Sequence, residues 1–378
     1  MPIRCLAKAL RFALGAGLLA AGLAASETIK IGEFASLTGK EATYGQTVHK
    51  GTLFAIEEIN AAGGVLGRPL ELVTEDNQSK AGESATVVKK LISRDKVIAV
   101  LGELTSGRTL EAAPICQTAK IPLISPGATN VSVTTKGNYI FRVCFIDDFQ
   151  GTVMAKFAYD SLKLRRVAIL SSASSAQSVG LAKFFRERFT AAGGTVVLEQ
   201  KYDEGDKDFR AQLTAIKAAG VEGIFVPGYY TEAALISKQA RELELTFPIF
   251  GGDGWEAPQL IEIGGKAMEG TYYSTHYSPE NSSPGVQSFV KKFRARFAGE
   301  TPDAMAALGY DSAMVLADAI KRAGTTEHGK LRTAIAATKN YNGVTGLTTI
   351  DASRNATKAA VVITVKDGAF KFVQAIAP

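Results

Sequence analysis

Four strand-like apolar runs in the chain each end in a small polar cluster: VIAVLGELTS, IPLISPGAT, GIFVPGYYTE and FPIFGGDGW. Between such runs, apolar residues recur at helical spacing, as in residues 47–60, so that strand and helix patterns alternate along the chain. This alternation predicts βαβ units and parallel sheets. In open parallel sheets, ligands bind outside the carboxyl ends of the strands. We therefore expect a binding site at the four polar clusters.

The alternation also predicts two lobes. One series of strands runs from TIKIGEF to YIFRVCF, and a second series begins after Phe149 with RRVAILSS. Both series use Ala-Ala-Gly-Gly to end a helix before a strand, as glycines do at helix C-termini. A chain of this length is also long enough for two cores. We predict two similar doubly wound α/β lobes.

The pattern becomes less regular after Gly270. It predicts a strand at TYYSTHYS, three helices up to about Thr338, and a closing pair of strands, GVTGLTTID and AAVVITVKDG. We expect this closing pair to be antiparallel and joined by the polar turn from Ser353 to Lys358.

The first 26 residues have the layout of a secretory signal peptide. A basic start is followed by the apolar stretch Phe12–Leu19 and then by small residues up to Ser26. The apolar stretch is too short to span a bilayer, and no later segment is apolar for long enough. We expect cleavage near residues 24–27 and an exported mature protein.

Charge and motifs argue against several function classes. The chain has 43 Lys and Arg against 37 Asp and Glu, and Arg4, Lys8 and Arg11 lie in the leader. The remaining balance is nearly even, without the basic patch of a nucleic-acid surface. The chain contains no G-x-S-x-G, H-E-x-x-H or Walker lysine motif, and no G-x-G-x-x-G between a strand and a helix. An enzyme, such as a hydrolase or dehydrogenase, is therefore disfavoured.

The remaining reactive residue types do not form a recognisable cluster. His49, His276 and His328 are scattered, and we interpret them as surface or packing residues. The acidic pair Asp147-Asp148 is interpreted as solvated helix caps, so we predict no metal site and no cofactor. Cys116 and Cys144 are compatible with one disulfide or with two buried free thiols.

The polar clusters suggest a site with a negative and a positive end. Ser106 can cap a helix, whose N-terminus favours an anion, and Thr129 adds a second hydroxyl after the neighbouring strand. Asp253 lies among three glycines, where a ligand can approach the backbone, and its natural partner is an ammonium group. Tyr229, Tyr230 and Trp255 either line the site or pack into the core.

At these residues the sequence resembles the leucine/isoleucine/valine-binding family of type I periplasmic solute-binding proteins of ABC transporters. The resemblance covers IKIGEFASLTGKEATYGQ, GTLFAIEEINAAGGVLGRPLELVTEDNQS, IPLISPGAT, FRVCFIDDFQG, DKDFRAQL and GVTGLTTID. It implies a periplasmic protein, expected as a monomer, with two closing lobes joined by a three-stranded hinge. The implied lobes are residues 27–144 plus 274–343 and residues 145–273 plus 344–378. The implied partner is a membrane permease.

The resemblance also implies roles for individual residues. Ser106 and Thr129 would bind the ligand carboxylate, and the Gly127 carbonyl and Asp253 would receive the ammonium group. The complete candidate set is Tyr44, Thr105, Ser106, Gly127, Ala128, Thr129, Gln177, Tyr229, Asp253 and Trp255. Two positions depart from the family pattern, because Gln177 or Ser178 replaces an expected aromatic residue and Asp253 replaces a common Glu.

These departures affect the selection of the ligand side chain more than the grip on the headgroup. We expect an amino acid, branched-chain or related. The alternatives are an aromatic acid, a short amide such as urea, or a sensory role in which the protein signals through a membrane receptor.

Overall fold

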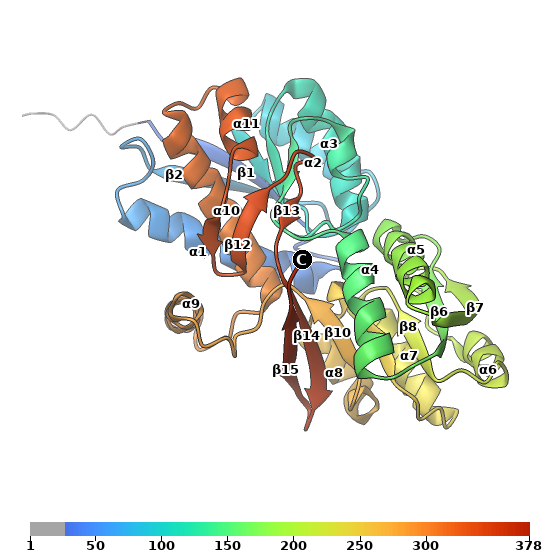
Figure 1. Ribbon diagram of the computed structural model, residues 1–378. Helices are drawn as coiled ribbons and strands as arrows, with labels where there is room; N and C mark the ends of the chain where they lie inside the picture. Colours follow the sequence, from blue (N-terminus) through green and yellow to red (C-terminus); the bar gives the residue numbers. More distant parts are fainter. Residues whose placement is uncertain (1–26) are drawn as a thin grey trace, which may run out of the picture.

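The computed structural model describes residues 27–378, so the predicted signal peptide lies outside the described residues. The chain forms two α/β lobes, each built around its own sheet (Figure 1). None of the helices within residues 27–378 combines the length and the apolar character that spanning a bilayer requires.

The first lobe contains a five-stranded parallel sheet with the strand order β2-β1-β3-β4-β5. Its strands are β1 (Ile29–Ala35), β2 (Leu70–Asp76), β3 (Ala99–Leu101), β4 (Leu123–Ser125) and β5 (Ile140–Arg142). Its helices are α1 (Ala42–Ala61), α2 (Glu83–Ser93), α3 (Ser106–Ala119), α9 (Pro284–Arg296), α10 (Ala304–Ala323) and α11 (His328–Ala336). The strands β3 and β4 are fully buried, as expected for apolar strands covered on both faces.

The second lobe contains a seven-stranded sheet with the order β15-β14-β10-β9-β8-β6-β7. Its strands are β6 (Arg166–Ser172), β7 (Thr195–Tyr202), β8 (Gly223–Val226), β9 (Ile249–Gly251), β10 (Tyr272–Thr275), β14 (Ala360–Lys366) and β15 (Ala369–Ile376). Its helices are α4 (Asp147–Lys156), α5 (Ala176–Ala191), α6 (Arg210–Ala218), α7 (Tyr230–Glu242) and α8 (Pro258–Gly264). Only β14 and β15 run antiparallel to their neighbours in this sheet.

The two lobes repeat one topology, which confirms the predicted pair of doubly wound lobes. The order β2-β1-β3-β4-β5 in the first sheet corresponds to β7-β6-β8-β9-β10 in the second. In each sheet the chain adds strands first on one side and then on the other side of the earliest strand, β1 or β6. Ligands of such sheets bind at the point where this direction changes. The Ala-Ala-Gly-Gly segments also act alike. In both, the second glycine donates to the carbonyl five residues earlier (Gly64 to Ile59, Gly194 to Phe189), the bond pattern that ends a helix.

The chain crosses between the lobes three times. The crossings lie between β5 and α4, between β10 and α9, and between β13 (Ala356–Thr357) and β14. Lys358 ties two of them together, because its Nζ donates to the carbonyl oxygen of Val143 at 3.0 Å. Together these crossings form the hinge.

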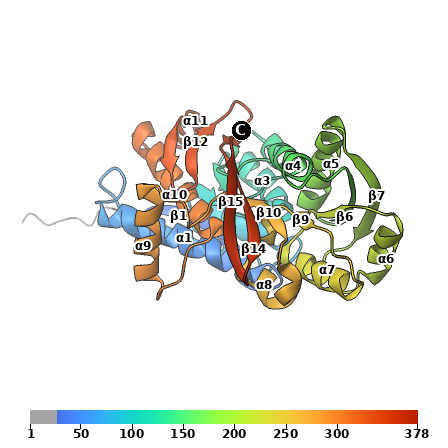
Figure 2. The same ribbon diagram turned by 60° about the horizontal axis from the view of Figure 1, so that its bottom comes forward.

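The predicted pairing of the two closing strands is wrong. GVTGLTTID contributes β12 (Gly346–Ile350), which pairs with β11 (Tyr341–Gly343) and β13 in a separate three-stranded antiparallel sheet. A tight turn explains this, because Asn355 N donates to Asp351 Oδ1 at 2.9 Å and folds the chain back onto β12. AAVVITVKDG instead forms β14, whose antiparallel partners are β10 and β15. Both views show β14 and β15 side by side beside β10 (Figure 1) (Figure 2).

These pairings also move the last lobe boundary. Because β12 and β13 pair with β11, sheet membership changes after Thr357 rather than at residue 344. We propose the division 27–144 plus 274–357 for the first lobe, with the remainder in the second.

Close helix packing supports the first lobe beneath the cleft. A Cβ atom on Gly51 of α1 would overlap the carbonyl oxygen of Ala306, and one on Gly309 of α10 would overlap that of Val48. The glycines therefore let the two helices approach each other at van der Waals distance. Cys116 and Cys144 are both buried free thiols, and burial raises the pKa of Cys144 to about 12.

Candidate ligand-binding cleft

A small cavity lies between the lobes at the carboxyl ends of β3, β4, β8 and β9. It is lined by Tyr44, Leu104, Thr105, Ser106, Gly127, Thr129, Gln177, Tyr229, Asp253, Gly254 and Met305. The space between the lining atoms is about 270 Å³, with the solvent at its mouth included. The room left inside the cavity is about 20 Å³, enough for roughly one water molecule, so the lobes stand close together over the lining residues.

The first lobe presents hydrogen-bond donors to the cavity. Helix α3 begins there, and the first N–H groups of a helix have no partner within the helix. Thr105, rather than the predicted Ser106, is its N-cap residue, and neither side chain caps the helix. The Ser106 hydroxyl instead accepts from Asn130 N at 3.1 Å, which leaves its own proton available. Thr129 Oγ1 is buried beside the carboxyl group of Asp147, whose pKa it lowers, and makes no hydrogen bond of ordinary geometry among the described residues.

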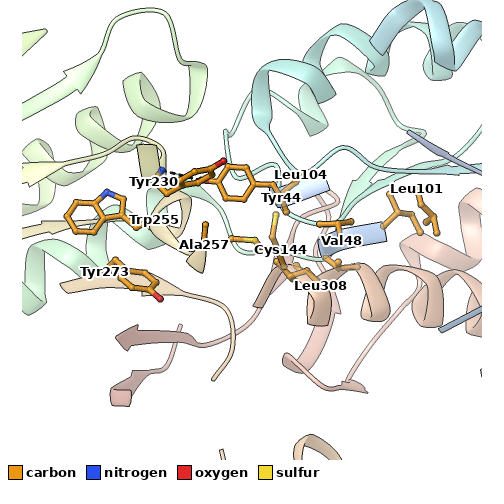
Figure 3. Close-up of a cluster of buried hydrophobic side chains, with 14 of the residues drawn as sticks. Tyr44, Val48, Leu101, Leu104, Cys144, Tyr230, Trp255, Ala257, Tyr273 and Leu308 are labelled. Atoms are coloured by element: carbon orange, nitrogen blue, oxygen red, sulfur yellow. Dashed lines mark hydrogen bonds between the residues drawn. The ribbon is translucent and has the colours of Figure 1, made fainter. Parts of the chain in front are cut away.

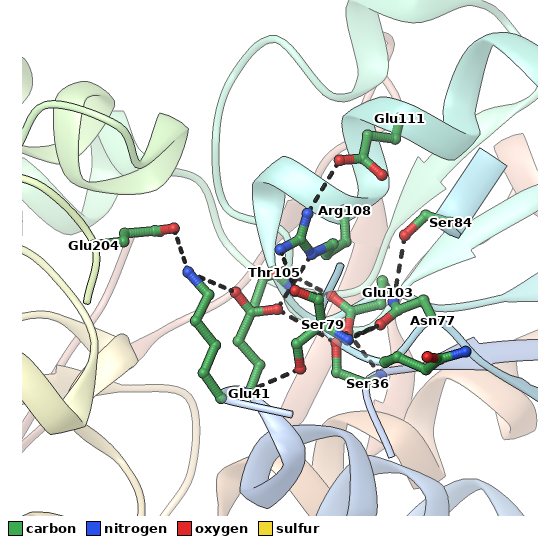
Figure 4. A network of polar contacts seen from close by, with 12 residues as sticks. Ser36, Glu41, Asn77, Ser79, Ser84, Glu103, Thr105, Arg108, Glu111 and Glu204 are labelled. Atoms are coloured by element: carbon green, nitrogen blue, oxygen red, sulfur yellow. Dashed lines mark hydrogen bonds and ion pairs between the residues drawn. The ribbon is translucent and has the colours of Figure 1, made fainter. Parts of the chain in front are cut away.

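A buried carboxylate holds the α3 N-terminus in place. Glu103 Oε2 accepts from both the backbone N and the hydroxyl of Thr105, each at 2.7 Å. Its Oε1 accepts from the hydroxyl of Ser36 at 2.8 Å. Figure 4 shows this group continuing through Glu41 to Arg108 and to the cleft mouth. Burial, together with the charge of Glu103, raises the pKa of Glu41 to about 7.

The second lobe presents acceptors. Asp253, which directly follows β9, is buried, and Oδ1 lies 3.4 Å from Gln177 Nε2. Oδ2 accepts a hydrogen bond from Nε2 of His276 at 3.0 Å, and no other ionisable side chain among residues 27–378 pairs with this carboxylate. Gln177 Oε1 is also buried, and it has no hydrogen-bond partner among residues 27–378. Two acceptors thus face the donors across the cavity.

The lobes are closed over this cavity. Tyr44 of the first lobe donates its hydroxyl to the carbonyl oxygen of Gly254 in the second. Asn130 Nδ2 donates to the Ala176 carbonyl at 2.6 Å, and Lys40 pairs with Glu204 at 2.7 Å. The hydroxyl of Tyr230 donates to the Lys40 carbonyl at 3.2 Å. The structure therefore represents the closed form.

Aromatic rings complete the wall. Tyr44 meets Tyr229 edge to face with ring centroids 5.8 Å apart, and burial raises the pKa of both hydroxyls, so both stay neutral. Trp255 does not line the cavity, because its ring packs against Gly251 and its Nε1 donates to the Val226 carbonyl at 3.0 Å. Figure 3 shows its ring pointing away from Tyr44, into the core of the second lobe. Ala128 does not line the cavity either, since it is buried beneath the loop and its carbonyl accepts from Arg142.

Eight of the ten predicted site residues therefore meet around one cavity, and three lining residues were not predicted. Leu104 sits between two predicted polar residues, and Gly254 beside Asp253, so their proximity in sequence could have identified them. Met305 comes from α10, 52 residues beyond Asp253, and no local signal marks it.

One interpretation of a single residue is also wrong. Asp147 is fully buried rather than a solvated cap, because α4 begins against the loop of Thr129, and burial raises its pKa to about 8. His276 is buried, as predicted for a packing residue, and its ring also contacts the carboxylate of Asp253. Among residues 27–378, no three His, Cys, Asp or Glu side chains form a cluster that could hold a metal ion.

Comparisons with known proteins agree with this geometry. Residues 28–369 match the family described as periplasmic binding protein. The Leu/Ile/Val-binding protein homolog 1 of Brucella suis is 33% identical over 313 residues, covering 82% of this chain and 83% of that protein.

Two solved structures are also similar. The leucine-binding protein LivK of Thermotoga maritima superimposes with a TM-score of 0.89 at 41% identity, covering 93% of this chain and 99% of that one. The branched-chain amino-acid-binding protein LivJ of Streptococcus pneumoniae, solved with isoleucine, gives 0.88 at 36% identity, covering 93% and 100%.

Proposed function

Because the chain belongs to the periplasmic binding protein family, we propose that it binds an amino acid between its lobes and delivers it to the membrane permease of an ABC importer. This family consists of solute-binding proteins, and we propose no enzymatic activity. Export through a signal peptide cleaved near residues 24–27, and a monomeric state, complete the proposal.

The opposed polarity of the cleft carries the proposal. On one side are the unpaired hydroxyl of Thr129 and the N-terminus of α3, which suit a carboxylate. On the other side are the carboxylate of Asp253 and the unpaired Oε1 of Gln177, which suit an ammonium group. Together with the Gly127 carbonyl, these acceptors match the three N–H bonds of an α-ammonium. A zwitterionic headgroup satisfies both ends at once.

The remaining wall favours an aliphatic side chain. Leu104, Met305 and the ring of Tyr229 provide the apolar surface of the cavity. Similar proteins are named for leucine, isoleucine and valine, so these amino acids and smaller homologues are the first candidates.

A ligand panel tests the proposal. The protein is purified without its leader, unfolded in guanidinium chloride to remove bound ligand, refolded, and titrated by isothermal calorimetry. We expect branched-chain or smaller aliphatic amino acids to bind, and the corresponding 2-oxo acids, benzoate and urea to bind at least a hundredfold more weakly. Tight binding of an amine-free acid or of urea, with no amino acid bound, would contradict the proposed ligand class. Turnover of a bound ligand would contradict the transport role.

A further inference from the structure

His276 connects the ligand cleft to the hinge. It directly follows β10, on the second crossing, and its side chain is fully buried. Nε2 lies 3.0 Å from Asp253 Oδ2, and the ring stacks on Phe145 of the first crossing with centroids 3.7 Å apart. The hydrogen bond and the stacking fix the ring in two directions, so the orientation of the Asp253 carboxylate depends on His276.

The charges around His276 are few. Asp253 faces Nε2, and Lys358 is the nearby cation on the third crossing. Burial lowers the pKa of His276 most strongly, contact with Asp253 raises it, and Lys358 lowers it slightly. The second ring nitrogen, Nδ1, is buried and has no partner among the described residues. A protonated ring would therefore bury an unsatisfied N–H in the closed form.

From this geometry we propose that His276 is a positioning residue for Asp253, and that a ligand ammonium group displaces a proton from its ring, so that amino-acid binding releases a proton. This inference rests on the proposed function. Without ligand, and at a pH below the pKa of the ring, a proton on Nδ1 gives the buried carboxylate its counter-charge. With ligand, the ammonium group supplies the counter-charge of Asp253 instead. The Nδ1 proton then passes to solvent, while Nε2–H continues to donate to Asp253.

The expected coupling is large enough to measure. An ammonium group bonded to the other carboxylate oxygen would lie roughly 6 Å from the ring, and at an effective dielectric constant of about 20 the two charges disfavour protonation about a hundredfold. Affinity should then fall by up to about tenfold per pH unit below the free-state pKa of His276.

Other buried carboxyl groups act in the opposite direction. Burial raises the pKa of Glu41 to about 7, that of Asp147 to about 8 and that of Glu256 to about 8. Such groups take up protons if closure buries them. The net number of protons that the wild type releases on binding is therefore not the contribution of His276 alone. The difference between wild type and His276→Gln does, because glutamine keeps a donor toward Asp253 and cannot be protonated near neutral pH.

The experiment combines calorimetry with a direct titration of the ring. Leucine binding to both proteins is measured at pH 5.5–8 in buffers of different ionisation enthalpy. At the acidic end we expect the wild type to release up to one proton more than the variant. Thermal unfolding of both proteins verifies that the variant folds. NMR titration of the imidazoles, of which the chain has three, gives the pKa of His276 with and without leucine, even if the variant does not fold.

The outcomes separate the two proposals. Amino-acid binding with a His276 pKa at least one unit lower in the complex supports the inference. Binding with an unchanged His276 pKa and equal proton counts in both proteins overturns it and leaves the proposed function intact. Failure of the wild type to bind any amino acid overturns the proposed function itself.

Discussion

Replacing Asp253 by asparagine tests the headgroup site most directly. The carboxylate is 5% exposed, and its contacts among the described residues are the Nε2 atoms of Gln177 and His276. Asparagine has nearly the same shape but no charge. Removing one partner of a buried, hydrogen-bonded charge pair costs about 2–5 kcal/mol, which corresponds to roughly a 30- to 4,000-fold loss of affinity.

The ligand-free protein should respond in the opposite way. Asp253 is a buried carboxylate that contacts His276, and because burial lowers the pKa of that ring, the carboxylate lacks a full counter-charge. Replacing this carboxylate by a neutral amide removes the cost of burying an incompletely compensated charge. We therefore expect the thermal unfolding midpoint of ligand-free Asp253→Asn to be no lower than that of the wild type. The leucine-dependent increase of the midpoint should shrink in proportion to the lost affinity.

The assay is calorimetric titration of refolded wild type and variant with leucine and with its 2-oxo acid. The variant should lose affinity for leucine and should not lose affinity for the oxo acid, which has no ammonium group. Unchanged leucine affinity would show that Asp253 does not receive an ammonium group. An equal loss for both ligands would show a general distortion of the cleft.

Three further predictions concern the donor side, the helix packing and the lobe interface. Thr129→Val should weaken amino-acid binding about 10- to 150-fold with little loss of stability, because its hydroxyl makes no well-formed hydrogen bond and lies only beside the carboxyl group of Asp147. Thr105→Val should lower stability as well, because it removes a donor from Glu103. Gly51→Ala should lower the unfolding free energy in urea by about 1–3 kcal/mol, whereas Gly285→Ala, where a Cβ meets nothing within 4 Å, should not. Glu256 of the second lobe accepts from Ala304 N of the first at 2.7 Å, and burial next to Asp303 raises its pKa from 4.5 to about 8. The closed form thus favours protonated Glu256, so the contribution of this residue to closure is full below about pH 4.5 and is lost as the pH rises through about 8. Ligand affinity measured across this range should therefore depend less on pH in Glu256→Gln than in the wild type. An identical pH profile in both proteins would contradict the role of Glu256 in closure.

The lining of the cleft was largely predictable because it follows strand ends. The end of a strand that is apolar along its whole length can be located in the sequence, because the apolar run stops there. Four lining residues lie within a few positions of such an end: Thr105, Thr129, Tyr229 and Asp253. Fold topology then brings those ends together. Met305 could not be found this way, because it reaches the cleft from a long helix whose axial position depends on tertiary packing.

The errors near the C-terminus have a different origin. The Asp367-Gly368 dipeptide, with both residues at positive φ, makes the tight turn between β14 and β15. Asp-Gly between alternating apolar residues is a strong hairpin signal, so the pairing of β14 with β15 could have been predicted from the sequence. The pairing of β12 was not, because it depends on how Asp351 and Asn355 close a local turn.

The polar layout of the cleft also explains how binding can drive closure. The contacts that join the lobes at the cleft mouth are few, and the Lys40–Glu204 pair is partly exposed, so it contributes at most about 1 kcal/mol. Closing the empty cleft, in contrast, buries the carboxylate of Asp253 and the unpaired groups of Thr129 and Gln177, each at a cost. A zwitterion of the right size removes these costs in the closed form alone, and a ligand shifts a conformational equilibrium by its differential affinity. An amine-free acid leaves Asp253 without its partner and should therefore stabilise the closed form less than an amino acid does. The unpaired charge of Asp253 thus contributes to selectivity as well as to affinity.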